Sequence, residues 1–105
     1  MRILVVDDEL AIAEIVSAML TPDGHVVETT TNGDDAFRIY CEHLRGPQPF
    51  DYVLTGLAQP GMSGLELVEA IARKNPKQRW GFSTAYPVLQ RPFTKDQLLA
   101  FVRLP

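Results

Sequence analysis

The sequence predicts an α/β domain whose sheet is mostly parallel and carries helices on both faces. Short apolar runs rich in β-branched residues alternate with longer segments whose apolar residues recur at helical spacing. The first of these runs is apolar throughout, as expected for a strand that is covered on both faces. A length of 105 residues corresponds to one domain, so we expect residues 1–105 to form a single unit.

The first half of the chain predicts two strands and two helices. The first run is continuous and β-branched, and the second is also rich in β-branched residues and is expected near a sheet edge. The predicted elements are a strand at 3–6, a helix at 9–20 ended by Pro22 and Gly24, a strand at 25–30, and a helix that starts at a cap, Asn32 or Asp34, and runs to about Leu44.

The second half repeats this alternation after a turn at residues 46–49. Ser63 is placed to cap a helix through about Lys74, and Glu66 stands at capping-box spacing from it. The other predicted elements are a central strand at 52–55, a fourth strand at 79–84, a short strand-like run at 88–90 and a last helix from Thr94.

This order of elements favours a doubly wound, flavodoxin-like sheet with strand order 2-1-3-4-5. In such a sheet, ligands and reactive groups lie at the carboxyl ends of strands one and three, where the strand order reverses. Asp7, Asp8 and Gly56 fall at these two ends. No G-x-G-x-x-G fingerprint is present, so support for a dinucleotide site is thin.

Composition and charge narrow the function classes. A net charge of -3 gives no electrostatic case for binding nucleic acid or an acidic membrane surface. No stretch of the sequence is long and apolar enough to span a bilayer. Cys41 is the single cysteine, so an internal disulfide is excluded and a reducing, cytoplasmic location is expected.

Three motifs resemble the receiver domain of two-component response regulators. They are Arg-Ile-Leu-Val-Val-Asp-Asp-Glu at 2–9, Pro-Gly-Met-Ser-Gly at 60–64 and Arg-Pro-Phe at 91–93. The resemblance covers nearly the whole chain and implies a CheY-like fold in a phosphorelay. Residues 82–89 also look like the FAT-GUY subgroup of single-domain receivers.

The resemblance implies a site for Mg²⁺ and for a phosphoryl group. In the family, two acids and an acceptor aspartate bind the metal; here the acids correspond to Asp7 and Asp8, and Leu57 to the residue that offers a backbone carbonyl. Gly56 stands at the acceptor position, so both the acceptor and one metal ligand are missing. The resemblance therefore implies weakened Mg²⁺ binding and no catalytic residue at this position.

Two further site residues follow from the same resemblance. Thr84 corresponds to the hydroxyl residue that ends strand four, and Arg91 replaces the lysine that ends strand five. A guanidinium is planar and always charged, which suits a bidentate carboxylate. We hypothesise that Arg91 pairs with Asp7 or Asp8; the alternative is that it points to solvent.

The connection after the fourth strand is too short for the expected fold. Only residues 85–87 separate Thr84 from Val88, a reach of about 10 Å, whereas parallel neighbours need a crossover of about a dozen residues. The helix between strands four and five is therefore missing from the chain, or the sequence as given omits it. Alternatively, the last strand does not pair in parallel here, or it swaps into a second copy.

A true deletion would uncover apolar residues and favour a partner. The apolar residues that such a deletion could leave uncovered are Trp80, Phe82, Val88 and Leu89.

The leading hypothesis is a degenerate receiver, or pseudo-receiver. It is not an enzyme, and it signals through contacts with a histidine kinase or another signalling protein, or as a homodimer through strand four, strand five and the last helix. Two alternatives remain: residual metal binding or phosphorylation at Asp7 or Asp8, and a small-ligand-binding α/β domain that uses the crevice at the strand ends.

Overall fold

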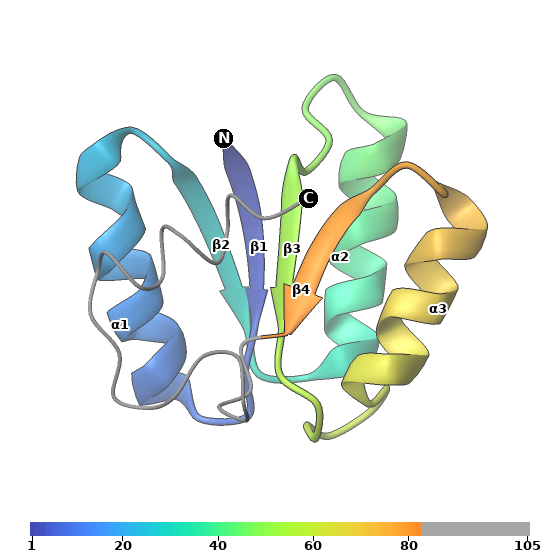
Figure 1. Ribbon diagram of the computed structural model, residues 1–105, viewed down its shortest axis with the longest axis horizontal. Coiled ribbons are helices and arrows are strands. Elements are labelled where there is room, and N and C mark those ends of the chain that lie inside the picture. Colours follow the sequence, from blue (N-terminus) through green and yellow to red (C-terminus); the bar gives the residue numbers. More distant parts are fainter. Residues whose placement is uncertain (83–105) are drawn as a thin grey trace.

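The computed structural model describes residues 1–82, which form four strands, three α-helices and one short 3-10 helix (Figure 1). In chain order these are β1 (Arg2–Val6), α1 (Leu10–Leu20), η1 (Thr21–Asp23), β2 (Val26–Thr30), α2 (Gly33–Arg45), β3 (Tyr52–Thr55), α3 (Gly64–Lys74) and β4 (Arg79–Phe82).

The four strands form one parallel sheet in the order β2-β1-β3-β4. This confirms the predicted doubly wound arrangement for the first four strands. In the centre, Ile3 of β1 lies opposite Tyr52 of β3, and Val6 lies opposite Thr55. The run at 88–90 and the helix expected from Thr94 fall outside the described residues, so the fifth strand and the extent of the single domain stay predictions.

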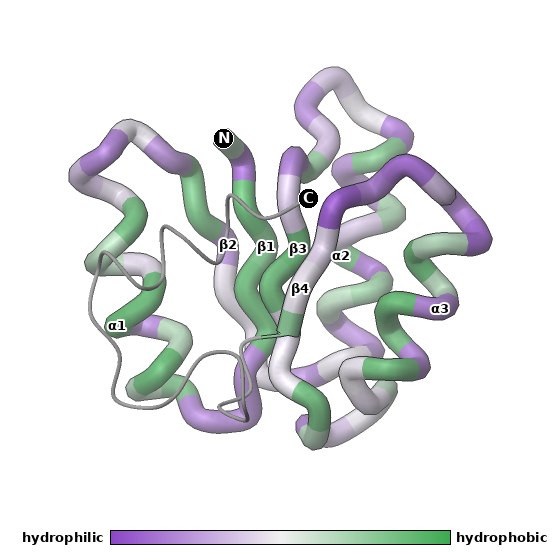
Figure 2. Tube along the Cα trace, in the orientation of Figure 1, coloured by the Kyte–Doolittle hydropathy of each residue, from purple (hydrophilic) through white to green (hydrophobic). Residues whose placement is uncertain are grey.

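Helices cover the sheet on both faces, with α1 on one face and α2 and α3 on the other (Figure 1). Alternate residues of β1 point to opposite faces, as the pleat of a strand requires. Ile3 and Val5 belong to the cluster with α1, whereas Leu4 and Val6 belong to the cluster with α2 and α3. The hydropathy of the chain follows this plan, because β1 is hydrophobic along most of its length and the segment after it is hydrophilic (Figure 2).

Side chains at the helix starts fix where α2 and α3 begin. The Asn32 side chain accepts hydrogen bonds from the backbone N–H groups of Asp34 and Asp35, so Asn32 is the cap. Ser63 and Glu66 form the predicted capping box, in which each side chain accepts from the other residue's backbone N–H. Both predicted ends of α3 are confirmed.

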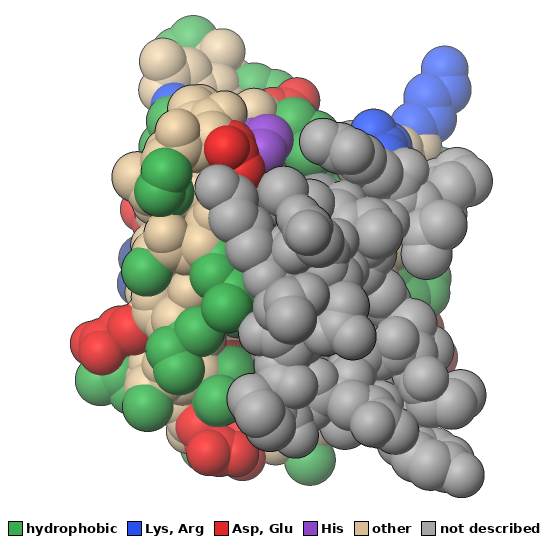
Figure 3. Space-filling view, turned by 60° about the vertical axis from the view of Figure 1, so that its left-hand side comes forward, with side chains coloured by type: hydrophobic (Ala, Val, Ile, Leu, Met, Phe, Trp, Pro, Cys, Tyr) green, Lys and Arg blue, Asp and Glu red, His purple; other side chains and the backbone are tan. Residues whose placement is uncertain are grey.

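The first helix differs from its prediction in two ways. It begins at Leu10 rather than Glu9. Pro22 does not stop the helical path, because it lies within η1, which directly follows α1 and ends at the C-cap Gly24 with a φ of 85°. Leu10 and Ile15, which belong to the apolar pattern, are 56% and 47% exposed. The face of the molecule that carries α1 therefore shows hydrophobic side chains among acidic ones (Figure 3).

None of the helices within residues 1–82 combines the length and the hydrophobicity that a bilayer crossing requires.

The capping box makes part of the stability pH dependent. The backbone N–H of Ser63, and secondarily its side chain, hold the pKa of Glu66 below its ordinary value of 4.5. A carboxyl whose pKa is lowered in the folded state stabilises the fold above the unfolded pKa, and this contribution is lost as the pH falls through the folded pKa. We expect Glu66→Gln, which keeps a capping-box side chain but does not titrate, to lose less stability on acidification.

Urea unfolding between about pH 5 and about pH 3, the range of carboxyl titration, checks this. The parent chain should lose more of its free energy of unfolding than Glu66→Gln over that interval. Parallel losses in the two proteins would contradict the assignment.

Candidate functional site

The carboxyl ends of β1 and β3 lie side by side and bring the predicted site residues to one edge of the sheet. The backbone N–H of Gly56 donates to the Val6 carbonyl at 2.8 Å, directly before Asp7. The Asp7 N–H in turn donates to the Thr30 carbonyl at 3.0 Å, at the end of β2. The predicted grouping of Asp7, Asp8, Gly56 and Leu57 at this edge follows from these contacts, whereas Thr84 and Arg91 lie beyond the described part of the chain.

The two adjacent acids have different surroundings. Asp7 is 1% exposed, and its Oδ1 accepts a hydrogen bond from the Glu9 N–H at 2.9 Å. A buried carboxylate needs such bonds, because an uncompensated charge away from water is strongly unfavourable. Asp8 is exposed. Asp7 is therefore held in the floor of the site, while Asp8 lies at its surface.

No steric demand explains the glycine at position 56. Its φ is not positive, and an added Cβ would lie 3.4 Å from Gln59 Oε1 and 3.6 Å from the Val6 carbonyl oxygen, which are ordinary contacts. Gly64 differs, because its Cβ would lie 2.2 Å from the Gly56 carbonyl oxygen. Gly61 has a φ of 77°, which favours glycine. The backbone thus needs glycine at 61 and 64 but has room for a Cβ at 56.

Gln59 fills part of the space beside Gly56 and was not predicted as a site residue. It is 9% exposed, and its Nε2 donates to the Met62 carbonyl at 3.1 Å and to Thr55 Oγ1 at 3.4 Å. The Thr55 hydroxyl donates onward to the Gly56 carbonyl at 2.9 Å. Gln59 Oε1 is buried without a hydrogen-bond partner among residues 1–82. Leaving such a group unsatisfied costs about 1–3 kcal/mol.

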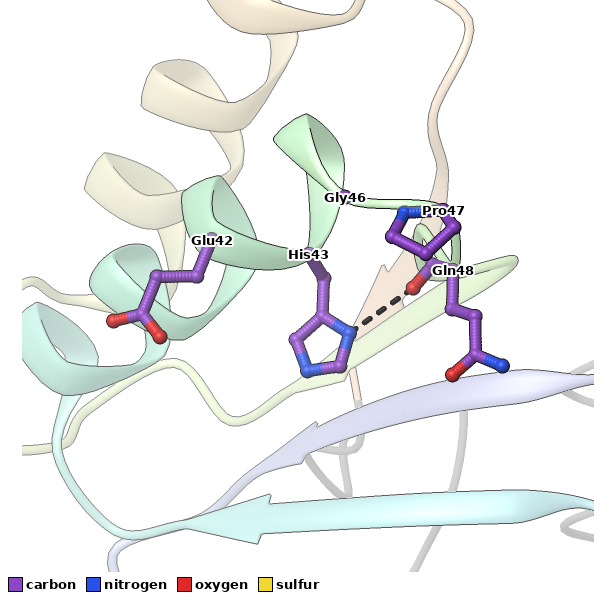
Figure 4. Close-up of a pocket in the computed structure, with 5 residues that line it drawn as sticks. All are labelled: Glu42, His43, Gly46, Pro47 and Gln48. Carbon is purple, nitrogen blue, oxygen red and sulfur yellow. Dashed lines mark hydrogen bonds between the residues drawn. The ribbon is translucent and has the colours of Figure 1, made fainter.

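A hollow of about 300 Å³ lies at the opposite end of the sheet (Figure 4). It is lined by Glu42, His43, Gly46, Pro47 and Gln48. The His43 Nδ1 lies 3.0 Å from the Gln48 carbonyl oxygen, and its Nε2 lies 3.0 Å from Glu28 Oε2. Both ring nitrogens of His43 already have partners, and the carboxyl ends of the strands lie at the other end of the sheet. We therefore interpret this hollow as part of the packing between α2 and the sheet.

The family model described as "Response regulator receiver domain" matches residues 3–90. The chain belongs to this family. It is a receiver domain of two-component signalling, which confirms the predicted family; the Arg-Pro-Phe motif at 91–93 follows the matched residues. The segments of the FAT-GUY pattern that follow Phe82 lie outside the described structure, so that subgroup stays a prediction.

Curated relatives of the receiver domain are about twice its length. It is 30% identical over 119 residues to the transcriptional regulatory protein DltR of Streptococcus agalactiae, covering 99% of this chain and 51% of DltR. It is 36% identical over 74 residues to the probable regulator TcrX of Mycobacterium tuberculosis, covering 70% of this chain and 30% of TcrX. The receiver chain thus spans about half of DltR and less of TcrX.

The alignment with DltR is longer than this chain, 119 against 105 residues. DltR therefore carries residues in the matched region that the receiver chain lacks.

Solved structures agree with the fold. A complex of histidine kinase ThkA with the response regulator TrrA is similar at 32% identity and a TM-score of 0.70, covering 92% of this chain and 78% of that chain. A receiver domain from Clostridium thermocellum has a TM-score of 0.81 at 23% identity and covers 96% and 90% of the two chains. The second likeness shows the fold alone.

Receiver domains generally bind Mg²⁺ at this edge, and the oxygen donors present here suit that ion. Magnesium takes one or two carboxylates and completes its octahedron with water, which Asp7 and Asp8 allow. Within residues 1–82 no group of three acids, histidines or cysteines gathers. The Leu57 carbonyl, predicted as a ligand, accepts from the Gly64 N–H at 2.7 Å. The role of the Leu57 carbonyl as a metal ligand stays a prediction.

The space at position 56 predicts that a small side chain stabilises the domain. Gly56→Ala should raise the free energy of unfolding by about 0.5 kcal/mol, because alanine restricts the unfolded chain and fits the native backbone. Gly61→Ala is the matched control. Its φ is positive and its Cβ would lie 2.6 Å from Asn32 Oδ1, so it should destabilise by about 1 kcal/mol or more.

Urea unfolding of the two variants and the parent measures both effects. A marked loss of stability in Gly56→Ala would contradict the conclusion that glycine is dispensable at position 56.

Proposed function

We propose that this receiver domain signals without aspartyl phosphorylation, through contacts with other proteins, and is not itself an enzyme. The observation that carries the proposal is Gly56 at the end of β3. Its backbone bonds to Val6 beside Asp7, where the family's acceptor is expected, yet it has no side chain. The function of this module then depends on its surface and not on a covalent change at that position.

The neighbouring acids are poor substitutes for the missing acceptor. Asp7 is buried and its Oδ1 is engaged by the Glu9 N–H. Asp8 is more accessible, but in the family both acids hold the metal, and a metal-bound carboxylate is a weak nucleophile. Phosphorylation at Asp7 or Asp8 is therefore disfavoured as the working chemistry.

The same loss of a carboxylate weakens Mg²⁺ binding in this proposal. Magnesium prefers charged oxygen ligands, and Gly56 withdraws one from the set that the family offers. Asp7 and Asp8 remain, so the site keeps an affinity for the ion that is lower than in a receiver with three acids.

Receiver domains pair with histidine kinases or other signalling proteins, and we propose such a protein as the partner of this cytoplasmic module. The ThkA–TrrA complex, whose matched chain is 32% identical, supports a kinase as partner. On β4, Trp80 is 39% exposed and packs against Phe82 with ring centroids 5.3 Å apart. This strand supports the proposed contact surface, for a partner or for a second copy of the chain. The net charge of -3 gives no support to nucleic-acid contact.

Treatment with a small phosphodonor and Mg²⁺, read by intact mass, tests the proposal. The parent chain should gain no phosphoryl group. Gly56→Asp should gain one, because the backbone leaves room for the side chain beside Asp7. Gly56→Asn is the matched control, of the same size but without a nucleophilic carboxylate, and should stay unmodified.

Uptake of a phosphoryl group by the parent chain would sink the proposal. Peptide mapping would then show whether Asp7 or Asp8 carries the group.

A further inference from the structure

The buried Oε1 of Gln59 is the one polar side-chain atom in the described structure that is both enclosed and without a partner. Gln59 as a whole is 9% exposed. Enclosed acceptors in native proteins are nearly always satisfied by protein, water or an ion. Such an atom beside a known type of site points to a missing occupant.

The orientation of the Gln59 amide is set by its neighbours. Its nitrogen faces the Met62 carbonyl oxygen at 3.1 Å, which can only accept. The hydroxyl of Thr55 donates its hydrogen to the Gly56 carbonyl, so its oxygen can only accept the hydrogen bond from Gln59 Nε2. Turning the amide over would place its oxygen against the Met62 oxygen, so the oxygen is directed at Gly56.

An acceptor side chain would start from Gly56 on that same side. The distance from Gln59 Oε1 to a Cβ built at position 56 is 3.4 Å. Asp7 and Asp8 follow β1, whose last residue receives the Gly56 N–H. Two carboxylates and an unpartnered amide oxygen therefore belong to the same pair of strand ends, and all three are donors that a hard divalent cation accepts.

We propose that Gln59 Oε1 takes over the ligand place of the missing acceptor carboxylate and faces a divalent cation held by Asp7 and Asp8, bonding to the ion or to one of its waters. Gln59 would then preserve the number of oxygen donors while lowering their charge by one. The inference rests on the metal site of the receiver family, and it does not depend on whether phosphoryl transfer occurs.

The NMR signals of the Gln59 side-chain amide report directly on whether Mg²⁺ binds beside it. In a Mg²⁺ titration of the ¹⁵N-labelled full chain followed by NMR, the two Nε2–H signals of Gln59 should shift together with the backbone amides of Asp7 and Asp8. Failure of the Gln59 signals to move while the Asp7 and Asp8 amides do would overturn the proposal. So would the absence of any Mg²⁺-dependent shift.

Two substitutions give opposite expected changes in Mg²⁺ affinity. Gln59→Leu should weaken Mg²⁺ binding about tenfold, and Gln59→Glu should strengthen it by a similar factor, because a carboxylate is the better ligand. Gln48→Leu, an exposed glutamine at the other end of the sheet, should leave the affinity unchanged. An unchanged affinity in a folded Gln59→Leu would refute the assignment, and if that variant does not fold, an unchanged or lowered affinity in Gln59→Glu would.

The metal titration and the phosphodonor assay separate two different failures. Uptake of a phosphoryl group by the parent chain would remove the proposed function and leave the role of Gln59 intact. Loss of the Gln59 effect would leave the absence of an acceptor at position 56 untouched.

Discussion

The pairing of β1 with β3 is the constraint on which the rest of the domain depends. Both strands are buried, and their register sets Val6 against Thr55, so Asp7 and Gly56 leave the sheet as neighbours. A slip of one residue would turn the apolar side chains of β1 to the wrong faces and separate the two apolar clusters from their helices. The core and the site are thus fixed by one set of backbone hydrogen bonds.

The loop after β3 has strict steric demands around Gly56, a position without a side chain. Gly64 approaches the Gly56 carbonyl too closely for a Cβ, and Gly33 approaches the backbone of Met62 in the same way. Gly61 has a left-handed backbone. These restrictions have nothing to do with the reactive group, because the backbone at Gly56 itself is ordinary. The steric demands of the scaffold are therefore separable from the side chain at the centre of the site.

Sequence alone predicted the elements that local patterns determine. The bounds of β3 and α3 follow from an apolar run and from a capping box that starts at Ser63, and both are confirmed. Gln59 was not predicted as a site residue because its burial depends on the path of a loop. A single polar residue before Pro60 forms no periodic pattern and no spaced motif from which its burial could be predicted.

Electrostatics offers a reason why a receiver can persist without its acceptor. Carboxylates that share a small site repel one another and raise each other's pKa values, unless a cation or hydrogen bonds compensate them. With Gly56 in place of an acid, and with Asp7 bonded to the Glu9 N–H, less negative charge is gathered at the strand ends. In the proposed site, the amide oxygen of Gln59 adds a donor without adding negative charge to these strand ends.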